Sequence, residues 1–146
     1  MTAQAGNGRA HVLVVEDNPA DVELLRYALS SAEVQCDLMV IDNGGDALAF
    51  FQQRGKYSGS EPPDLAILDL NLPRYDGIEI LGAMRANRAF AGVPVAVLSS
   101  SPSPRDRAKI EAFHIGRYIM KPPNLEEYLR IGLIVKELLE GGRSVS

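Results

Sequence analysis

The stretch "LAILDLNLP", residues 65–73, carries a run of apolar residues into Asp69 and, four residues later, into Pro73. A short apolar run of this kind, bounded by turn-forming residues, predicts a strand that is buried on both faces of a sheet. Asp69 has an ordinary explanation as a turn residue ahead of Asn71 and Pro73. It has a functional explanation if the strand belongs to a parallel sheet, because ligands bind at the carboxyl ends of such strands.

Runs of strand-forming apolar residues alternate along the chain with helical patterns, in which apolar residues recur every three or four positions. The five predicted strands are "HVLVV" (11–15), "CDLMVI" (36–41), "DLAIL" (64–68), "PVAVL" (94–98) and "RYIM" (117–120). A helical pattern follows each of them. This alternation predicts an α/β fold, a doubly wound (βα)5 three-layer sandwich whose parallel sheet has the flavodoxin-like order 2-1-3-4-5.

The chain has 146 residues, which suits one domain with one core. We expect this domain to span 10–141, with a disordered N-terminal tail at 1–9 and a C-terminal tail at 142–146. Asn18 before Pro19 predicts the start of the first helix, with asparagine as the N-cap and proline at the first helical position. The last helix is predicted to end near "EGG", residues 140–142.

Composition argues against several classes of function. The net charge is −4 and the basic residues are scattered, so we expect no nucleic-acid binding. The single cysteine, Cys36, excludes an internal disulfide and fits a reducing cytoplasm. The sequence has no 18-residue apolar stretch and starts without an apolar leader, so neither a membrane span nor export is expected.

Acidic, hydroxyl and basic side chains follow the predicted strands where each strand ends. They are Glu16, Asp17, Asp69, Ser99 and Lys121. Neighbouring strands lie about 4.8 Å apart, so the carboxylates after the first and third strands must crowd one another. Two like charges 4 Å apart near a protein surface repel by roughly 4 kcal/mol, and one lysine offsets only part of this charge. The set therefore predicts a divalent cation, of which Mg²⁺ suits carboxylate and phosphate oxygens best.

A phosphoryl group fits such a site, because the carboxylate of Asp69 can act as its nucleophile. Lys121, the Ser99 hydroxyl and the cation would then stabilise the phosphoryl oxygens. Taken singly, these residues have ordinary explanations, such as helix capping by Asp17 or a solvated lysine at 121. Their joint position at strand ends favours the functional interpretation. Tyr118 is open to two readings, half-buried packing or a switch.

At these residues the chain resembles the receiver domain of two-component response regulators, the CheY-like family. The resemblance covers about residues 10 to 140. It is carried by "VLVVEDNPADVELLRYAL", "PDLAILDLNLPRYDGIEIL", "VPVAVLSSS" and "RYIMKPP". The longer loop before Asp64, with the "LNLPR" and "DNPADV" segments, is most similar to stand-alone regulators that pair with bacterial phytochrome histidine kinases.

The resemblance implies a set of metal ligands around the phosphoacceptor Asp69. Asp17 is implied as a direct Mg²⁺ ligand, Glu16 as a ligand acting mainly through water, and the backbone carbonyl of Asn71 as a further ligand.

It also implies how the domain switches. Ser99 is implied as the switch hydroxyl, Lys121 as the phosphoryl counter-ion and Tyr118 as the aromatic side chain whose rotamer follows the hydroxyl. The Lys121–Pro122 peptide bond is expected to be cis. Ser99 stands where threonine is common, which removes a packing methyl. Pro123 after Pro122 stiffens the entry to the last helix.

The function implied is that of a single-domain, cytoplasmic phosphoacceptor rather than an enzyme. A sensor histidine kinase of the bacteriophytochrome type would phosphorylate Asp69. The surface formed by the fourth helix, fifth strand and fifth helix would then switch between two arrangements and provide a homodimer contact.

Three alternatives remain beside it. One is a receiver-like docking module that binds its partner without phosphorylation, which the intact acidic and lysine set disfavours. Another is an aspartyl-phosphate hydrolase, disfavoured because Asn71 stands where a general acid is needed. The third, nucleotide or flavin binding, lacks a glycine-rich loop after the first strand.

Overall fold

The sheet contains five parallel strands in the order β2-β1-β3-β4-β5, as expected. The structure is a computed structural model, and it describes residues 9–72, 74–100 and 104–144. The strands are β1 (Ala10–Val15), β2 (Cys36–Ile41), β3 (Leu65–Asp69), β4 (Val95–Ser99) and β5 (Arg117–Met120). The helices are α1 (Pro19–Ser31), α2 (Gly44–Phe51), α3 (Gly77–Ala86), α4 (Pro104–Glu111) and α5 (Leu125–Ser144). Two 3-10 turns, η2 (Gly55–Tyr57) and η3 (Arg88–Phe90), lie in the connections.

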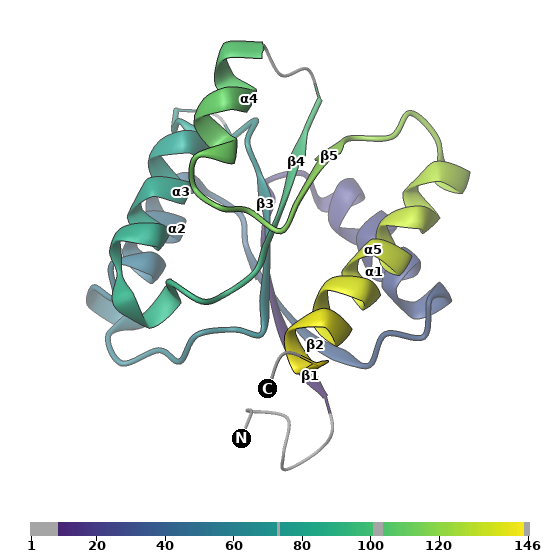
Figure 1. Ribbon diagram of the computed structural model, residues 1–146, viewed down its shortest axis with the longest axis horizontal. Helices are drawn as coiled ribbons and strands as arrows, with labels where there is room; N and C mark the ends of the chain where they lie inside the picture. Colours follow the sequence, from purple (N-terminus) through teal and green to yellow (C-terminus); the bar gives the residue numbers. More distant parts are fainter. Residues whose placement is uncertain (1–8, 73, 101–103, 145–146) are drawn as a thin grey trace.

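Helices cover both faces of the sheet. α2, α3 and α4 lie on one side and α1 and α5 on the other (Figure 1). Successive side chains of a strand point to opposite faces, so β1 supplies Leu13 and Val15 to one core cluster and Val12 and Val14 to the other. Because both faces of the central strands are covered, β1, β3 and β4 are buried along almost their whole length, and their apolar runs could be predicted from sequence.

The core beneath α2 and α3 is aromatic. Phe50 and Phe51 of α2 contact Phe90 at ring-centroid distances of 5.5 and 5.3 Å. All three rings are buried. Burying a phenylalanine side chain contributes about 1.5–3 kcal/mol, and aromatic pairs add about 0.5–1.5 kcal/mol. The helices on this face are therefore packed firmly against the strands whose ends carry the polar residues.

On the other face, α1 and α5 approach each other closely. A Cβ atom at Gly132 of α5 would collide with the backbone carbonyl of Ala28 in α1. Glycine is needed here for its lack of a side chain, because the two helix backbones are nearly in contact.

The predicted start of α1 is confirmed, and the bounds of the folded region differ slightly from expectation. The Asn18 side chain accepts a hydrogen bond from the backbone N–H of Ala20, as an N-cap does. α5 continues to Ser144, beyond the predicted end near 140–142, because glycine weakens a helix without terminating it. Arg9, expected in the tail, donates to the Asp37 carboxylate at 2.8 Å. The rest of the expected N-terminal tail and residues 145–146 lie outside the described residues.

Candidate functional site

Three carboxylates meet at the carboxyl end of the sheet. Glu16 and Asp17 follow β1, and Asp69 is the last residue of β3, the strand that pairs with β1. An oxygen of each carboxylate lies within 4.8 Å of the others. Glu16 and Asp69 are only 3% and 2% exposed, while Asp17 is exposed. The prediction that these side chains converge is confirmed, and we call Glu16, Asp17 and Asp69 the carboxylate cluster.

Lys121, one residue after β5, reaches across to the carboxylate cluster. Its Nζ lies 3.0 Å from Glu16 Oε1 and 3.2 Å from Asp69 Oδ2. Burial alone would lower the pKa of Lys121. Hydrogen bonds to Asp21 and Glu16 and the negative charge of Asp69 outweigh burial and raise that pKa. Lys121 is therefore a permanent positive charge beside Asp69.

The third partner of Lys121 is Asp21, which sequence reasoning missed. Asp21 Oδ2 lies 3.0 Å from the lysine Nζ. Asp21 lies in the first turn of α1, where the helix dipole stabilises a negative charge. This ordinary explanation suggests no further role for it. The sequence offered no signal for this contact, because Asp17 lies before α1 begins and an acidic residue in the first turn of a helix is common.

The environment of Glu16 favours the protonated form of its carboxyl group. Burial raises its pKa from 4.5 to about 7, helped by the hydrogen bond and charge of Asp69, while contacts to Lys121 and the Asn18 backbone act in the opposite direction. The backbone N–H of Asn18 donates to Glu16 Oε2 at 3.1 Å. Three carboxylates and one ammonium leave this group of side chains with a net negative charge. The hard oxygen donors and their unbalanced charge fit a divalent cation.

Asp69 is also the turn residue that its sequence context suggests. Its Oδ1 accepts a hydrogen bond from the backbone N–H of Asn71 at 2.9 Å. The Asn71 side-chain oxygen accepts from the backbone N–H of Ser100 at 2.8 Å. The loop after β3 is therefore joined to the loop after β4, and the turn role of Asp69 is compatible with its place in the carboxylate cluster.

Ser99 and Tyr118 lie on neighbouring strands. Ser99 ends β4 and is buried, and β4 pairs with β5, where Tyr118 packs against the core beneath α3. The Tyr118 hydroxyl is buried and has no hydrogen-bond partner within the part of the chain that the structure describes. Its ring is stacked by Arg107 of α4, with the guanidinium carbon 4.7 Å from the ring centroid. Tyr118 is a half-buried packing residue in this state.

The expectation of a cis Lys121–Pro122 bond is wrong, because the described residues contain no cis peptide bond. The trans form is intrinsically favoured by about 0.5–1 kcal/mol before proline. With this bond trans, the Lys121 backbone N–H still donates to the Ser99 carbonyl at 2.8 Å and the ammonium still reaches Glu16 and Asp69. The positions of these groups therefore do not require the cis form.

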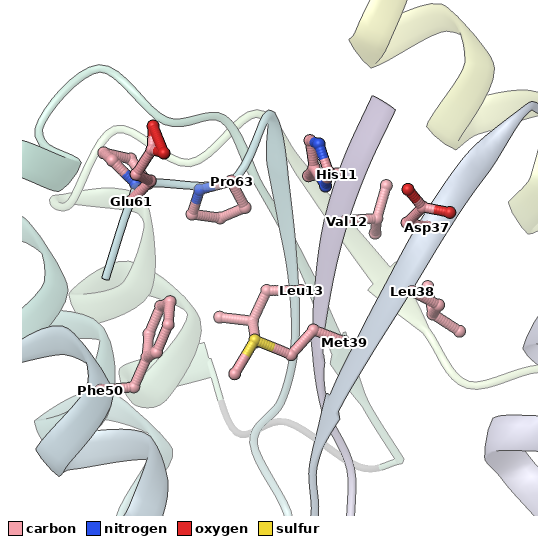
Figure 2. Close-up of a pocket in the computed structure, with 10 residues that line it drawn as sticks. His11, Val12, Leu13, Asp37, Leu38, Met39, Phe50, Glu61 and Pro63 are labelled. Carbon is pink, nitrogen blue, oxygen red and sulfur yellow. The ribbon is translucent and has the colours of Figure 1, made fainter. Parts of the chain in front are cut away.

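A separate hollow of about 240 Å³ lies between β1, β2 and α2. Figure 2 shows it lined by Leu13, Met39 and Phe50, with His11 and Glu61 nearby. His11 and the start of β2 belong to the opposite end of the sheet from Glu16 and Asp69. This hollow contains none of the predicted site residues. Within the described ranges, no helix has both the length and the apolar character needed to span a bilayer.

Comparison with known proteins identifies the class. The model of the response regulator receiver domain matches residues 12–131, and the chain belongs to this family. Response regulator Rcp1 from Synechocystis is 35% identical over 120 residues, which cover 82% of each chain. The crystal structure of the phosphorylated cyanobacterial phytochrome response regulator RcpA matches with a TM-score of 0.80 and 34% identity, covering 90% of this chain and 94% of RcpA.

The structure of Rcp1 in its Mn²⁺-bound form matches with a TM-score of 0.76 and 34% identity, covering 84% of this chain and 88% of Rcp1. The expected likeness to phytochrome-associated regulators is thus confirmed. A divalent metal in a similar protein agrees with the donor chemistry of the carboxylate cluster. As a receiver domain, the chain has a histidine kinase as its implied partner.

Proposed function

We propose that Asp69 accepts a phosphoryl group from the phosphohistidine of a sensor kinase. One observation supports this above the others: Asp69 is a buried carboxylate 3.2 Å from the Lys121 ammonium, next to two carboxylates suited to a cation. A carboxylate so placed is a nucleophile whose product, an acyl phosphate, meets positive charge as it forms.

In the transfer step, an Asp69 oxygen forms a bond to phosphorus while the bond from phosphorus to the histidine nitrogen breaks. The electron pair of the broken bond stays on the imidazole, which can then take up a proton. Lys121 holds its ammonium beside the new phosphoryl oxygens, and Ser99 supplies a hydroxyl donor from the adjacent strand. The chain is in this view a phosphoacceptor with its own phosphorylation and dephosphorylation chemistry, not a turnover enzyme.

The cation is Mg²⁺ in this proposal. Asp17 and Asp69 would hold it directly, Glu16 mainly through water, and the Asn71 backbone carbonyl would complete the protein ligands. Bound Mg²⁺ supplies positive charge to the phosphoryl oxygens as negative charge develops on them. The charge count supports the choice of a cation site, because Glu16 and Asp69 are buried carboxylates beside Asp17 and share a single ammonium, that of Lys121.

The switch follows the new charge. In the proposal, Ser99 moves toward the phosphoryl group, Tyr118 changes rotamer, and the surface of α4, β5 and α5 shifts its population between two arrangements. On this surface Met120, Leu125 and Leu133 are 62%, 47% and 57% exposed. Large exposed apolar side chains of this kind support a homodimer contact or a partner contact there.

The kinase partner is proposed to be of the phytochrome type, acting in the cytoplasm. The names of the similar proteins support this choice, since RcpA is described as a phytochrome response regulator. A kinase that has phosphorylated itself should transfer its label to this chain, and a phytochrome-type kinase should do so faster than a histidine kinase with another sensor.

The first test is phosphorylation by a small donor. Wild-type protein incubated with Mg²⁺ and acetyl phosphate should gain one phosphoryl group by intact mass, and hydroxylamine should remove it. Asp69→Asn should gain none. Asp76→Asn is the matched control, because Asp76 is an exposed N-cap of α3 and asparagine caps equally well. Equal labelling of wild type and Asp69→Asn would reject the proposal, and no labelling of wild type would favour the docking module.

A further inference from the structure

The ammonium of Lys121 is shared by three carboxylates, of which only two belong to the carboxylate cluster. Its Nζ lies 3.0 Å from Glu16, 3.2 Å from Asp69 and 3.0 Å from Asp21. The Asp21 side chain comes from α1 and is 21% exposed, whereas Glu16 and Asp69 come from the strand ends and are buried. Asp21 therefore binds the lysine from outside the cluster.

A cation and the ammonium compete for the same oxygens. Glu16 and Asp69 are the two cluster members that Lys121 contacts, and both are proposed metal residues. Like charges in one pocket repel, so a divalent cation that enters must weaken the hold of Lys121 on these two carboxylates. Asp21 gives the ammonium a remaining charged partner, because it contacts the lysine without being one of the three clustered carboxylates.

We propose that Asp21 is a positioning residue that holds the Lys121 ammonium beside Asp69 while a divalent cation takes the carboxylate cluster. This inference rests on the proposed function, because it concerns the cation and counter-ion of Asp69. Without Asp21, the lysine relies on Glu16 and Asp69 alone and competes with the cation for them. Asp21 thus favours metal binding, although it contributes no metal ligand.

A purely structural role for Asp21 makes a different prediction. As an acidic residue in the first turn of α1, Asp21 stabilises the helix through its dipole. If that were its only role, Asp21→Asn would lower the free energy of unfolding, and the effect would not depend on Lys121. A direct metal ligand, as a second alternative, would matter for the cation whether or not the lysine is present. The three roles separate in a double-mutant cycle.

The experiment measures Mg²⁺ affinity by calorimetry in 0.15 M salt, with Mg²⁺ alone and no phosphodonor. Asp21→Asn should weaken binding by about five- to tenfold, a change of roughly 1–1.4 kcal/mol. Asp21→Glu keeps the charge and should recover part of the affinity. Glu23→Gln is the matched control, because Glu23 is a 75% exposed carboxylate of the same helix paired with Arg26. Its loss should change the affinity by less than twofold.

Lys121→Met supplies the second arm of the cycle. In that background Asp21→Asn should have a smaller effect than in the wild type, because the group that Asp21 positions is gone and only the attraction between the Asp21 charge and the cation remains. An undiminished effect there would overturn the inference, because Asp21 would then act on the cation directly, as a ligand or through its charge, and unaltered Mg²⁺ affinity in the single variant would overturn it too. Undetectable Mg²⁺ binding by the wild type would also overturn it. Failure of Asp69 labelling with the binding results intact would instead reject the proposed function alone.

Discussion

Burial of Glu16 at the site makes the stability of the metal-free protein depend on pH. Its pKa of about 7 lies above the ordinary 4.5, so between these values the folded protein holds a proton that the unfolded chain has released. Stability therefore falls as pH rises through this window. For the metal-free protein we expect the Glu16 contribution to lower the free energy of unfolding by up to about 3 kcal/mol from pH 4.5 to pH 7.

Urea unfolding at pH 5.0 and pH 7.5 in the presence of a chelator measures this difference. The neutral variant Glu16→Gln has no proton to lose at this position and should show a smaller decline. The same decline in both proteins would show that another group causes it.

At this scale the sequence predicted the meeting of Glu16, Asp17, Asp69 and Lys121, because parallel strands bring their carboxyl ends to one edge. It could not predict Asp21, since a helix position does not state which way a flexible carboxylate turns. The prediction of a cis peptide bond before Pro122 was wrong for a related reason. The energy difference between the cis and trans isomers is small, and the local sequence does not decide which isomer forms.

Among the elements, the contact between α1 and α5 depends on the absence of a side chain at Gly132. Gly132→Ala would push a methyl group into the Ala28 carbonyl, and we expect the free energy of unfolding to fall by about 1–3 kcal/mol. Gly141→Ala is the control in the same helix, because no described atom lies within 4 Å of a Cβ there. It should be neutral or stabilise by up to about 1 kcal/mol. Chemical denaturation compares the two, and equal losses would contradict this account.

Element positions were predictable where burial is uniform and less so at the ends. All five strands and their helices follow from apolar patterns. β2 and β5 have the expected bounds, and the other strands differ by one residue at one or both ends, as in β4 (Val95–Ser99) against the expected 94–98. The shift places Ser99 inside the strand instead of after it. The continuation of α5 past 142 was missed, because a pair of glycines resembles a helix end, although glycine weakens a helix without terminating it.

For the whole molecule, binding of a cation to the folded state alone should raise stability. Mg²⁺ at a hundredfold excess over its dissociation constant would add about 2.7 kcal/mol, and for a domain of this size each kcal/mol raises the melting temperature by roughly 2–4 °C. A chelator should reverse this rise in melting temperature, and Asp17→Asn should abolish most of it. Thermal unfolding followed by circular dichroism provides the measurement. An equal gain in Asp17→Asn would place the cation elsewhere.

The contact at Gly132 also bears on the charges at the other end of the two helices. α1 carries Asp21 in its first turn, and α5 begins four residues after Lys121. The seam at Ala28 and Gly132 lies about two turns further along each helix and fixes how near the two helices run. A bulkier residue at Gly132 would push the two helices apart. The distance between Asp21 and Lys121 would then increase although neither residue had been changed.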